Sequence, residues 1–265
     1  MLPAVPPSLN LRRASILEMI QHRGYVTIEA LAAHFNTSQQ TIRRDFSYLA
    51  ERGLVERCHG GAMMAAKTFQ QLPAERACSL RHLAELAVNH IQSGMTVYLD
   101  SGEESNAVAS ALLASQKRCR VVSNNLDIAQ RLSASPVIEA IIPGGSVKRM
   151  AKRDMFIAHG DLVMSIVRMF HYDIAFMSVH AFDDEGTVMQ EDLSDVALKQ
   201  GVMELTDKVI ALSSQVRQDA KANIRVCKAI AFDGFICNEA LPVWLADAMK
   251  QANVAVQVAD ASVCA

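Results

Sequence analysis

Hydrophobic residues recur at helical spacing in three short segments near the start of the chain. Residues 12–22 place Ile16 and Ile20 on one face of a predicted helix, and the segment IEALAAHF that follows repeats the pattern. Thr37 followed by Gln40 has the spacing of a capping box, which predicts that a third helix starts there. The front of the chain is therefore expected to be a three-helix unit.

The third predicted helix leaves polar side chains on its N-terminal half, while Ile42, Phe46 and Leu49 share its apolar face. A helix fits the major groove of B-DNA and reaches the base edges with its N-terminal residues; Gln pairs with adenine, and Arg with guanine or a phosphate. Residues 54–62, LVERCHGGA, follow as a predicted hairpin whose length suits a wing along the DNA backbone. The pattern predicts a winged helix-turn-helix domain, and the alternative is a small helical bundle with a solvated arginine pair.

We expect the helix to read base edges, while its flank and the hairpin hold phosphates. The candidates for base contact are Gln39, Gln40, Thr41 and Arg43. The candidates for backbone contact are Arg44 and His59, and Thr37, Ser38 and Gly60 complete the candidate DNA-binding set.

From residue 74 onward, predicted helices alternate with short, continuously apolar segments that are typical of buried strands. This alternation predicts an α/β fold with a largely parallel sheet, covered by helices on both faces. Ligands of such sheets bind outside the carboxyl ends of the strands. The candidate strands are residues 96–100, 120–124, 139–143, 172–179, 208–214, 229–237 and 254–260.

Polar residues gather in the loops that follow these strands, so five loops could form one pocket at a single edge of the sheet. The loops contain Asp100-Ser101-Gly102-Glu103-Glu104, Ser123-Asn124-Asn125, Gly144-Gly145 with Lys148, His180 with Asp183, and Ser214 with Arg217. Taken one loop at a time, the glycine pair also fits a plain turn, and the asparagines fit helix caps.

Composition agrees with a folded protein of two domains. The 265 residues are 51% hydrophobic and 20% charged, and the first 66 hold seven Lys or Arg against five Asp or Glu, which favours a polyanion partner at the front. No apolar run approaches the roughly 18–20 residues of a membrane span, and no signal peptide is expected. The six cysteines lack C-x-x-C or metal-ligand spacing and are expected to be free thiols in a cytoplasmic protein.

The expected organisation is a disordered lead-in at 1–11, a winged helix-turn-helix DNA-binding domain at 12–62, a linker at 63–73, and an α/β effector-sensing and oligomerisation domain at 74–265.

The stretch RGYVTIEALAAHFNTSQQTIRRDFSYLAERGLVERCHGGA, with T-I-R-R-D at 41–45 and H-G-G-A at 59–62, resembles the DNA-binding domain of the DeoR family of bacterial transcription repressors. It is most similar to the subgroup of glycerol-3-phosphate repressors. Residues 80–245 resemble the sensor domain of the same family, whose fold is similar to ribose-5-phosphate isomerase. The resemblance implies a phosphorylated sugar or polyol held by the strand-end loops.

The motifs of the family fall on the polar loops of this chain. D-x-G-T-T falls on 100–104, T-N-N on 123–125, G-G on 144–145, D-x-x-G on 183–186 and D-S-S-K on 214–217. The effector site implied by the resemblance comprises Asp100, Gly102, Glu103, Glu104, Ser123, Asn124, Asn125, Gly144, Gly145, Lys148, Asp183 and Arg217.

Two departures from the family pattern bear on the ligand. Glu103 and Glu104 replace both threonines of D-x-G-T-T, and Ser214 and Arg217 replace the Asp and Lys of D-S-S-K. A carboxylate about 4 Å from a phosphate costs on the order of 4 kcal/mol at an effective dielectric of about 20, so ordinary sugar phosphates are expected to be excluded. The glutamates are expected to accept hydrogen bonds from a neutral or cationic ligand, or to pair with Arg217 or Lys148. As first-turn residues of the next helix, they could also face solvent.

The leading hypothesis is a DNA-binding repressor of carbohydrate or polyol metabolism genes, controlled by a small-molecule effector and without catalytic residues, metal or cofactor. Its expected partners are double-stranded operator DNA, the effector and further copies of the chain, since a helix-turn-helix reads half-sites in a symmetric dimer or tetramer. One alternative is a sugar-phosphate isomerase fused to a DNA-binding module, although the replaced Asp and Lys argue against retained chemistry. Another is a regulator with no small-molecule ligand.

Overall fold

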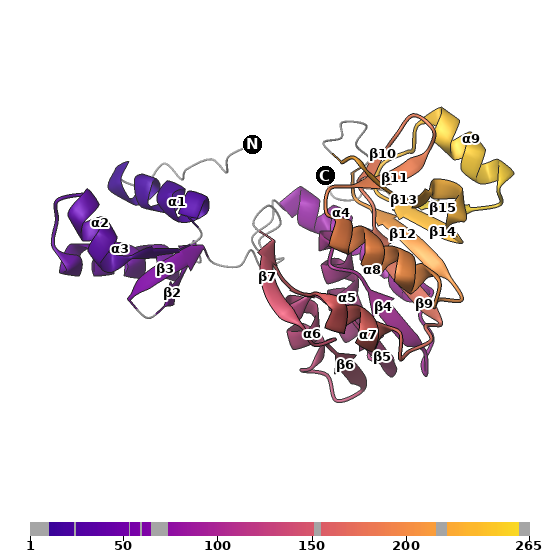
Figure 1. Ribbon diagram of the computed structural model, residues 1–265, viewed down its shortest axis with the longest axis horizontal. Helices are drawn as coiled ribbons and strands as arrows, with labels where there is room; N and C mark the ends of the chain where they lie inside the picture. The colour runs from indigo at the N-terminus through magenta and orange to yellow at the C-terminus, as the bar shows by residue number, and fades with distance from the viewer. Residues whose placement is uncertain are drawn as a thin grey trace. The chain divides into compact units, whose positions relative to one another are not determined.

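The computed structural model of the chain describes residues 11–23, 25–52, 54–58, 60–64, 74–150, 155–215 and 222–259. The chain forms two compact units, Met1–Thr68 and Phe69–Ala265. Among its described residues, the first contains three helices and a three-stranded sheet, and the second is a larger α/β unit (Figure 1).

The first unit packs three helices against an antiparallel sheet. Its elements are α1 (Leu11–Arg23), β1 (Tyr25–Thr27), α2 (Ile28–His34), α3 (Gln39–Glu51), β2 (Val55–Cys58) and β3 (Gly61–Met64), with the strands ordered β1-β3-β2. The apolar stripes predicted from the sequence meet in one core, where Ile16, Ile42 and Phe46 are buried. The predicted hairpin is formed by β2 and β3, and the candidate phosphate contact His59 lies outside the described residues.

The N-cap of α3 lies one residue later than the capping-box spacing predicted. Ser38, not Thr37, is the cap, and its Oγ accepts a hydrogen bond from the N–H of Thr41 at 3.2 Å. This bond satisfies an amide that has no partner within the helix. Thr37 instead closes the turn after α2, where its N–H donates to the carbonyl of Ala32 at 2.9 Å.

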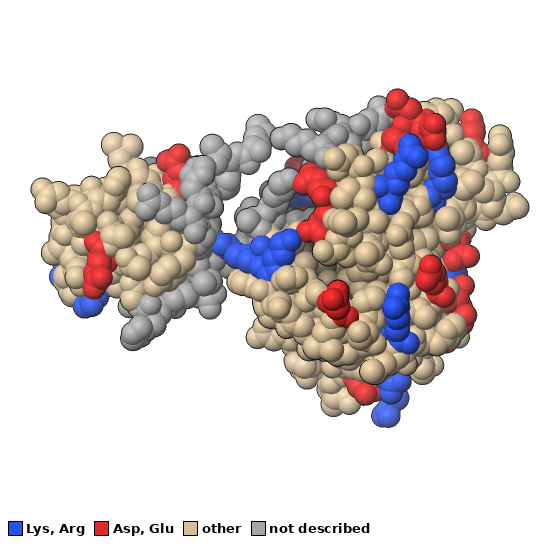
Figure 2. Space-filling model, in the orientation of Figure 1, with Lys and Arg blue, Asp and Glu red and all other residues tan. Residues whose placement is uncertain are grey.

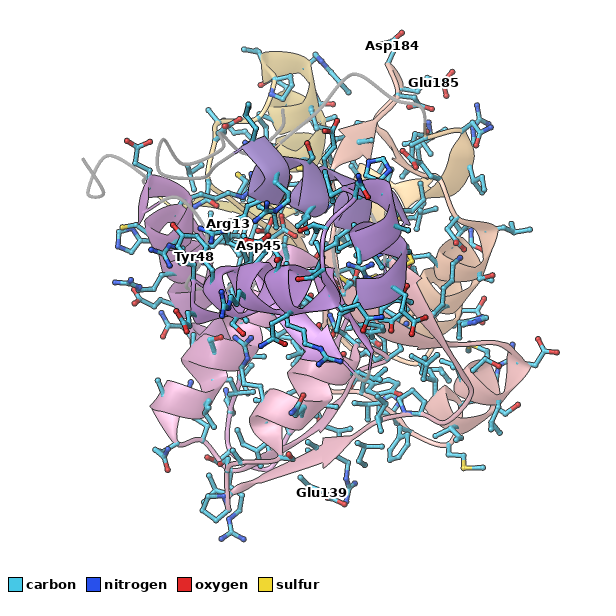
Figure 3. The ribbon with its side chains drawn as sticks, turned by 90° about the vertical axis from the view of Figure 1, so that its left-hand side faces the viewer. Arg13, Asp45, Tyr48, Glu139, Asp184 and Glu185 are labelled. Atoms are coloured by element: carbon cyan, nitrogen blue, oxygen red, sulfur yellow. The ribbon has the colours of Figure 1, made fainter. Side chains whose placement is uncertain are left out.

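A buried carboxylate joins the first helix to the third. Asp45 of α3 is 1% exposed and accepts hydrogen bonds from Nε of Arg12 at 2.6 Å and Nε of Arg13 at 2.7 Å. Arg13 also lies over the ring of Tyr48, with its guanidinium carbon 3.7 Å from the ring centre (Figure 3). The guanidinium carbon of Arg52 lies 3.6 Å from the same centre. The position of α3 therefore depends on charged contacts as well as on apolar packing.

A seven-stranded parallel sheet forms the centre of the second unit, as the alternating pattern predicted. In spatial order its strands are β15 (Ala255–Val258), β14 (Gly234–Cys237), β12 (Val209–Ser213), β9 (Ile174–Ser178), β4 (Thr96–Leu99), β5 (Cys119–Val122) and β6 (Ile138–Ile141). Its helices are α4 (Ala74–Asn89), α5 (Glu103–Ser115), α6 (Leu126–Leu132), α7 (Asp161–Val167), α8 (Leu193–Met203) and α9 (Val243–Gln251).

Alternate side chains of the strands enter two apolar cores, one on each face of the sheet. On β9, Phe176 packs in the core formed with α4, α5 and α6, whereas its neighbour Met177 packs in the core formed with α7, α8 and α9. Because both faces are covered, the central strands are continuously apolar rather than alternating.

Two antiparallel elements were not predicted from the sequence. The strands β7 (Ser146–Met150) and β8 (Met155–His159) pair as a hairpin where a basic loop was expected. A second sheet is ordered β10 (Ala181–Phe182), β11 (Thr187–Gln190) and β13 (Ile224–Lys228). Strands such as β7, with Lys148 and Arg149, are short, partly exposed and polar, so they lack the apolar run that marked the central strands.

The strand predicted for 229–237 is interrupted. A short 3-10 helix, η2 (Ala229–Ala231), precedes β14, and only the second half of the apolar run joins the sheet. Asp233 lies between the two, and its carboxylate accepts a hydrogen bond from the N–H of Val209 at 2.7 Å. This contact fixes the residue at which β14 begins beside β12. The apolar run in the sequence does not indicate that starting point.

Cysteine pairing also differs from the expectation. Cys119, Cys227 and Cys237 are free, whereas Cys78 of α4 is disulfide-bonded. The expectation of free thiols is therefore wrong for Cys78, because pairing depends on distance in the folded chain rather than on sequence spacing.

The surface of the α/β unit carries charges of both signs. On the face shown in Figure 2, its acidic and basic side chains are interspersed. Within the described ranges, no helix has the length and apolar character needed to cross a membrane.

Candidate functional site

Helix α3 presents the polar side chains of its N-terminal half to solvent. Those of Gln39, Gln40, Arg43 and Arg44 are exposed, and that of Thr41 is half-buried. Ile42 and Phe46 of the same helix lie in the core, so α3 cannot turn its polar face inward without exposing them. Amide and guanidinium groups at an exposed helix N-terminus are the arrangement that reads base edges in a major groove.

Two glycines bring the hairpin of the first unit close to β1. Gly60 has a φ of +76°, a backbone conformation that favours glycine, and its carbonyl accepts a hydrogen bond from the N–H of Ile28 at 2.9 Å. A Cβ on Gly61 would lie 2.3 Å from the carbonyl oxygen of Val26. Gly60 is therefore the candidate DNA-binding residue that the structure describes at the tip of the hairpin. Its carbonyl holds the hairpin against the start of α2.

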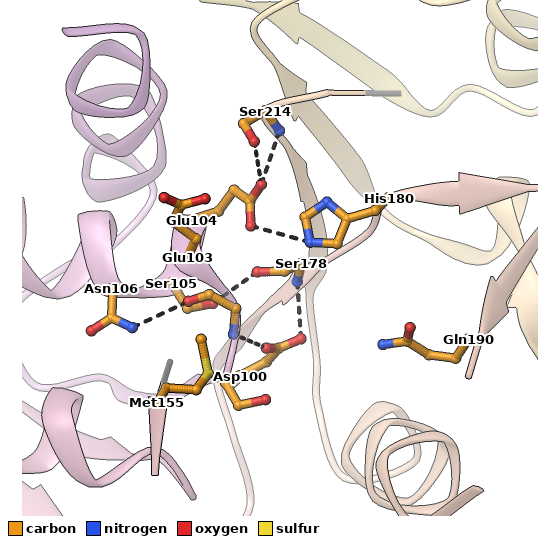
Figure 4. A network of polar contacts seen from close by, with 12 residues as sticks. Asp100, Glu103, Glu104, Ser105, Asn106, Met155, Ser178, His180, Gln190 and Ser214 are labelled. Carbon is orange, nitrogen blue, oxygen red and sulfur yellow. Dashed lines mark hydrogen bonds and ion pairs between the residues drawn. The ribbon is translucent and has the colours of Figure 1, made fainter. Parts of the chain in front are cut away.

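In the α/β unit, the order of the strands reverses between β4 and β9. From β4 the chain runs outward through β5 to β6, and it then returns to add β9, β12, β14 and β15 on the other side. Ligands of open parallel sheets bind at such a reversal, beyond the carboxyl ends of the strands. Asp100, Ser178 and Ser214 lie at the ends of β4, β9 and β12 (Figure 4).

Asp100 holds the ends of β4 and β9 together. Its Oδ1 accepts a hydrogen bond from the N–H of Gly102 at 2.6 Å, and its Oδ2 accepts one from the N–H of Ser178 at 3.0 Å. The ammonium of Lys199, on α8, donates to the same Oδ2, and both side chains of this ion pair are 4% exposed. The carboxylate is therefore satisfied by three separate segments of the fold.

Lys199 and Ser178 were not predicted from the sequence. Lys199 lies in the stretch VALKQGV of α8, between Val196 and Val202, which are buried. A single lysine on the apolar face of a predicted helix is the signal that would have marked it, because lysine is almost never fully buried without a partner. Ser178 lies within a predicted buried strand, and nothing in the pattern distinguishes it.

Gly102 allows α5 to approach β9. A Cβ at this position would lie 1.8 Å from Oγ of Ser178. Its φ is −75°, so the glycine is needed for space rather than for a left-handed backbone. The close approach also brings Oγ of Ser105 to 3.4 Å from Oγ of Ser178.

Glu103 and Glu104 begin α5 but lie in different environments, because consecutive helical residues are about 100° apart around the axis. Glu103 is 33% exposed, and its Oε2 accepts a hydrogen bond from Nη2 of Arg76, on α4, at 2.5 Å. Glu104 is 0% exposed. The two glutamates therefore cannot share one role.

The carboxylate of Glu104 lies at the carboxyl end of β12 (Figure 4). Its Oε1 accepts hydrogen bonds from the N–H of Ser214 at 3.1 Å and from the Ser214 hydroxyl at 2.6 Å. Nε2 of His180 lies 3.6 Å from Oε2, an oxygen that accepts no hydrogen bond from the described residues. Burial alone would raise the pKa of Glu104, but His180 and the bonds from Ser214 outweigh burial, so this pKa lies below its ordinary value.

The loop at 123–125 connects neighbouring segments of the site. Asn125 caps α6 through its Oδ1, as the helix-cap interpretation predicted, and its Nδ2 donates to the carbonyl of Ser101 at 3.4 Å. Asn124 donates from Nδ2 to the carbonyl of Ala158 in β8 at 3.3 Å. Oγ of Ser123 accepts a hydrogen bond from the N–H of Asn125 at 3.2 Å. These polar groups hold β5 and α6 against the loop after β4.

The glycine pair at 144–145 packs against the start of α7. Gly145 has a φ of +139°, and a Cβ there would lie 2.6 Å from the carbonyl oxygen of His159. A Cβ on Gly144 would lie 3.3 Å from the side chain of Leu162. The pair therefore forms a turn whose tightness requires Gly145.

The remaining candidates make contacts of their own. Lys148 pairs with Asp192 at 2.9 Å, so the expectation that it pairs with a glutamate of α5 is wrong. Asp183 lies in the turn between β10 and β11, where its Oδ1 accepts a hydrogen bond from the N–H of Thr187 at 2.7 Å. Arg217 lies outside the described residues. The predicted effector residues thus divide between a buried cluster at the ends of β4, β9 and β12 and separate contacts elsewhere.

Both units match known protein families. Residues 12–68 match the DeoR-like helix-turn-helix domain, and residues 79–239 match the DeoR C terminal sensor domain. The chain belongs to the DeoR family. The resemblance inferred from the sequence and the predicted fold class are both confirmed.

Relatives of this DeoR-family protein include two proteins of Escherichia coli (strain K12). It is 31% identical to the glycerol-3-phosphate regulon repressor over 197 residues, 73% of this chain and 76% of that protein. It is 26% identical to the HTH-type transcriptional repressor CsqR over 249 residues, 92% of this chain and 94% of that protein. Among solved structures, ribose 5 phosphate isomerase A from Neisseria gonorrhoeae is similar over 54% of this chain and 55% of that chain, with a TM-score of 0.39 and 11% identity.

We expect Lys199→Met to lower the free energy of unfolding of this DeoR-family protein by about 3–5 kcal/mol, because it leaves the buried Asp100 carboxylate without its cation. Chemical denaturation followed by circular dichroism measures the change. In the control, Lys199→Met combined with Asp100→Asn should recover part of the loss, since both charges are removed. A loss below about 1 kcal/mol in the single variant, the size of a surface pair, would contradict a buried ion pair.

Proposed function

We propose that this DeoR-family protein is a sequence-specific DNA-binding repressor of genes for carbohydrate or polyol metabolism. The observation that carries the proposal is the capped helix α3, which presents Gln39, Gln40 and Arg43 to solvent from its N-terminal half. The names of relatives support this class, among them the glycerol-3-phosphate regulon repressor and the putative aga operon transcriptional repressor of Escherichia coli O157:H7. The L-fucose operon activator of Haemophilus influenzae is also similar, at 26% identity over 240 residues, and is named for the opposite effect.

The proposed division of labour follows the position of each side chain on α3. Side chains in the first turns read base edges, and the side chain of Arg44 holds a phosphate. A base-reading residue contributes sequence preference, whereas a phosphate contact contributes affinity for every sequence. The residues proposed to read bases are Gln39, Gln40, Thr41 and Arg43. Those proposed to lie along the DNA backbone are Thr37, Ser38, His59 and Gly60.

We expect Gln40→Ala and Arg43→Ala each to weaken binding to a selected operator by about 1–3 kcal/mol and to relax preference at one base pair, because a hydrogen-bonded base contact is lost. Gel shifts with the selected operator and single-base variants of it measure both effects. Arg168→Ala, which removes an exposed arginine of the α/β unit, is the charge-matched control and should bind as the parent does. Parent-like binding by both α3 variants would contradict the assignment of α3.

We further propose that the α/β unit binds a small-molecule effector beside the ends of β4, β9 and β12, and that it is not an enzyme. A sugar-phosphate isomerase needs a carboxylate that is available to remove a proton. Asp100 is instead bound by Lys199 and two backbone N–H groups, and Glu104 is bound by Ser214. An ionised, buried Glu104 in this cluster disfavours a phosphate at the same place, so the proposed effector is a sugar, a polyol or a derivative without a phosphate group.

A thermal-shift screen of sugars, polyols and their phosphates tests the effector. We expect an uncharged sugar or polyol to raise the unfolding temperature of the protein, because a ligand that binds only the folded state stabilises it by mass action. The corresponding phosphates should leave the temperature unchanged. Shifts with phosphates alone would contradict the proposed exclusion, and an absence of shifts across the panel would favour a regulator without a small-molecule ligand.

We propose that the α/β unit also supplies the contact between copies of the chain, since a symmetric operator needs paired DNA-binding units. Light scattering on the full chain and on residues 74–265 should give the same number of subunits. A full-length oligomer that becomes monomeric without the first unit would show that the DNA-binding units provide the pairing.

A further inference from the structure

We propose that the carboxylate of Glu104 occupies an anion-binding position in the sensor, as a tethered substitute for the anionic group of a ligand. The proposal rests on the α/β unit being an effector-binding domain, and it adds that the protein itself supplies the anion. An effector without a phosphate group then needs to contribute only its hydroxyl groups.

Ser214 and His180, from two separate segments of the fold, both face this carboxylate. The N–H and the hydroxyl of Ser214, after β12, donate to Oε1 at 3.1 and 2.6 Å. From the segment before β10, His180 places Nε2 3.6 Å from Oε2 (Figure 4). Helix-start amides, hydroxyls and imidazoles are groups that proteins use to hold phosphate and carboxylate ligands.

The start of α5 favours a negative charge at this place. The helix has 13 residues, and its N-cap Gly102 provides no side-chain hydrogen bond to the first amides. Unpaired amides and the positive end of the helix dipole attract an anion. Of the two acidic residues in the first turn of α5, Glu104 is the one that lies inside the fold, since Glu103 is 33% exposed.

Glu104 fills the position rather than repelling anions from its rim. Its side chain is 0% exposed, and Oε2 is buried without a hydrogen-bond partner among the residues that the structure describes. Glu103, one residue earlier, shows the contrasting arrangement, since it is 33% exposed and pairs with Arg76. Oε2 of Glu104 is therefore the oxygen that lacks a hydrogen-bond donor in the described part of the chain, while Oε1 is bound to Ser214.

Occupancy and repulsion predict different behaviour for two substitutions of Glu104. Repulsion acts through charge, so Glu104→Gln, which keeps the volume and removes the charge, would admit phosphate. Occupancy acts through volume as well, so Glu104→Gln stays closed, and only a shorter side chain opens the position. Glu104→Thr provides the shorter side chain, and threonine is the residue that the family pattern has at this position. Glu103→Thr is the matched control in the same helical turn.

Isothermal titration calorimetry with inorganic phosphate, at an ionic strength held constant with sodium chloride, compares the parent with these three variants of the full chain. We expect Glu104→Thr to bind phosphate at least about tenfold more tightly than the parent, because a buried like charge and its volume are both removed. Glu103→Thr and Glu104→Gln should behave as the parent does. Circular dichroism of each protein confirms that the variants are folded.

Three results would overturn the proposal. Phosphate binding by Glu104→Gln as tight as that by Glu104→Thr would show that the glutamate acts by charge alone. Glu104→Thr with the same affinity as the parent would show that no anion position exists. Millimolar binding of phosphate by the parent would show that the position is open.

A measurement on the parent decides the matter if Glu104→Thr does not fold. The carboxyl carbon of Glu104 is followed by NMR as the pH is lowered, with Glu104→Gln used to assign its signal. A carboxylate held by convergent donors stays ionised below the ordinary glutamate pKa of 4.5, whereas a buried carboxyl without donors takes up its proton above that value. Titration above 4.5 would overturn the proposal.

These outcomes are separate from the fate of the proposed function. Gel shifts with the parent test operator binding whatever the phosphate titrations show. If the parent bound no operator while Glu104→Thr gained affinity for phosphate, the repressor proposal would fail and the tethered-anion proposal would stand. If the parent bound operator but Glu104→Thr gained no affinity for phosphate, the tethered-anion proposal would fail and the repressor proposal would stand.

Discussion

The buried ion pair between Asp100 and Lys199 is the interaction on which the arrangement at the carboxyl ends of β4 and β9 depends. A buried carboxylate must be compensated, and Asp100 takes its compensation from α8 and from two backbone N–H groups, those of Gly102 and Ser178. The same contacts therefore hold β4, β9 and α8 in one arrangement. They also set the place where α5 begins, and with it the position of Glu104 at the reversal of strand order.

Helical geometry then separates two glutamates that are adjacent in the sequence. Glu103 turns toward α4 and meets Arg76 at the surface, whereas Glu104 turns inward and meets Ser214 and His180. Space for this inward turn exists because Gly102 has no side chain to collide with Ser178. The loop in which the family pattern has two threonines thereby carries a buried carboxylate, and this is the local departure in sequence on which the proposed choice of effector rests.

Much of the fold could be predicted because its elements have strong periodic signals. The central strands are apolar on both faces, so they stand out as continuous runs, and the helices of the first unit bury regular stripes such as that of Ile16 and Ile20. The elements that escaped prediction have weaker signals. The hairpin of β7 and β8 carries polar side chains, and the change from η2 to β14 depends on the contact of Asp233 with Val209.

The sequence by itself determined the family, the two-unit organisation and the identity of the polar loops, because motifs and periodicity are local properties of the chain. It also identified Glu103 and Glu104 as a departure from the family pattern. Only the tertiary structure decided which of the two is buried and what each contacts. Arg76, Lys199 and Ser214 come from segments far apart in the sequence, and the charge, burial and hydrogen bonds that set the behaviour of a carboxylate depend on distances in space that no local pattern encodes.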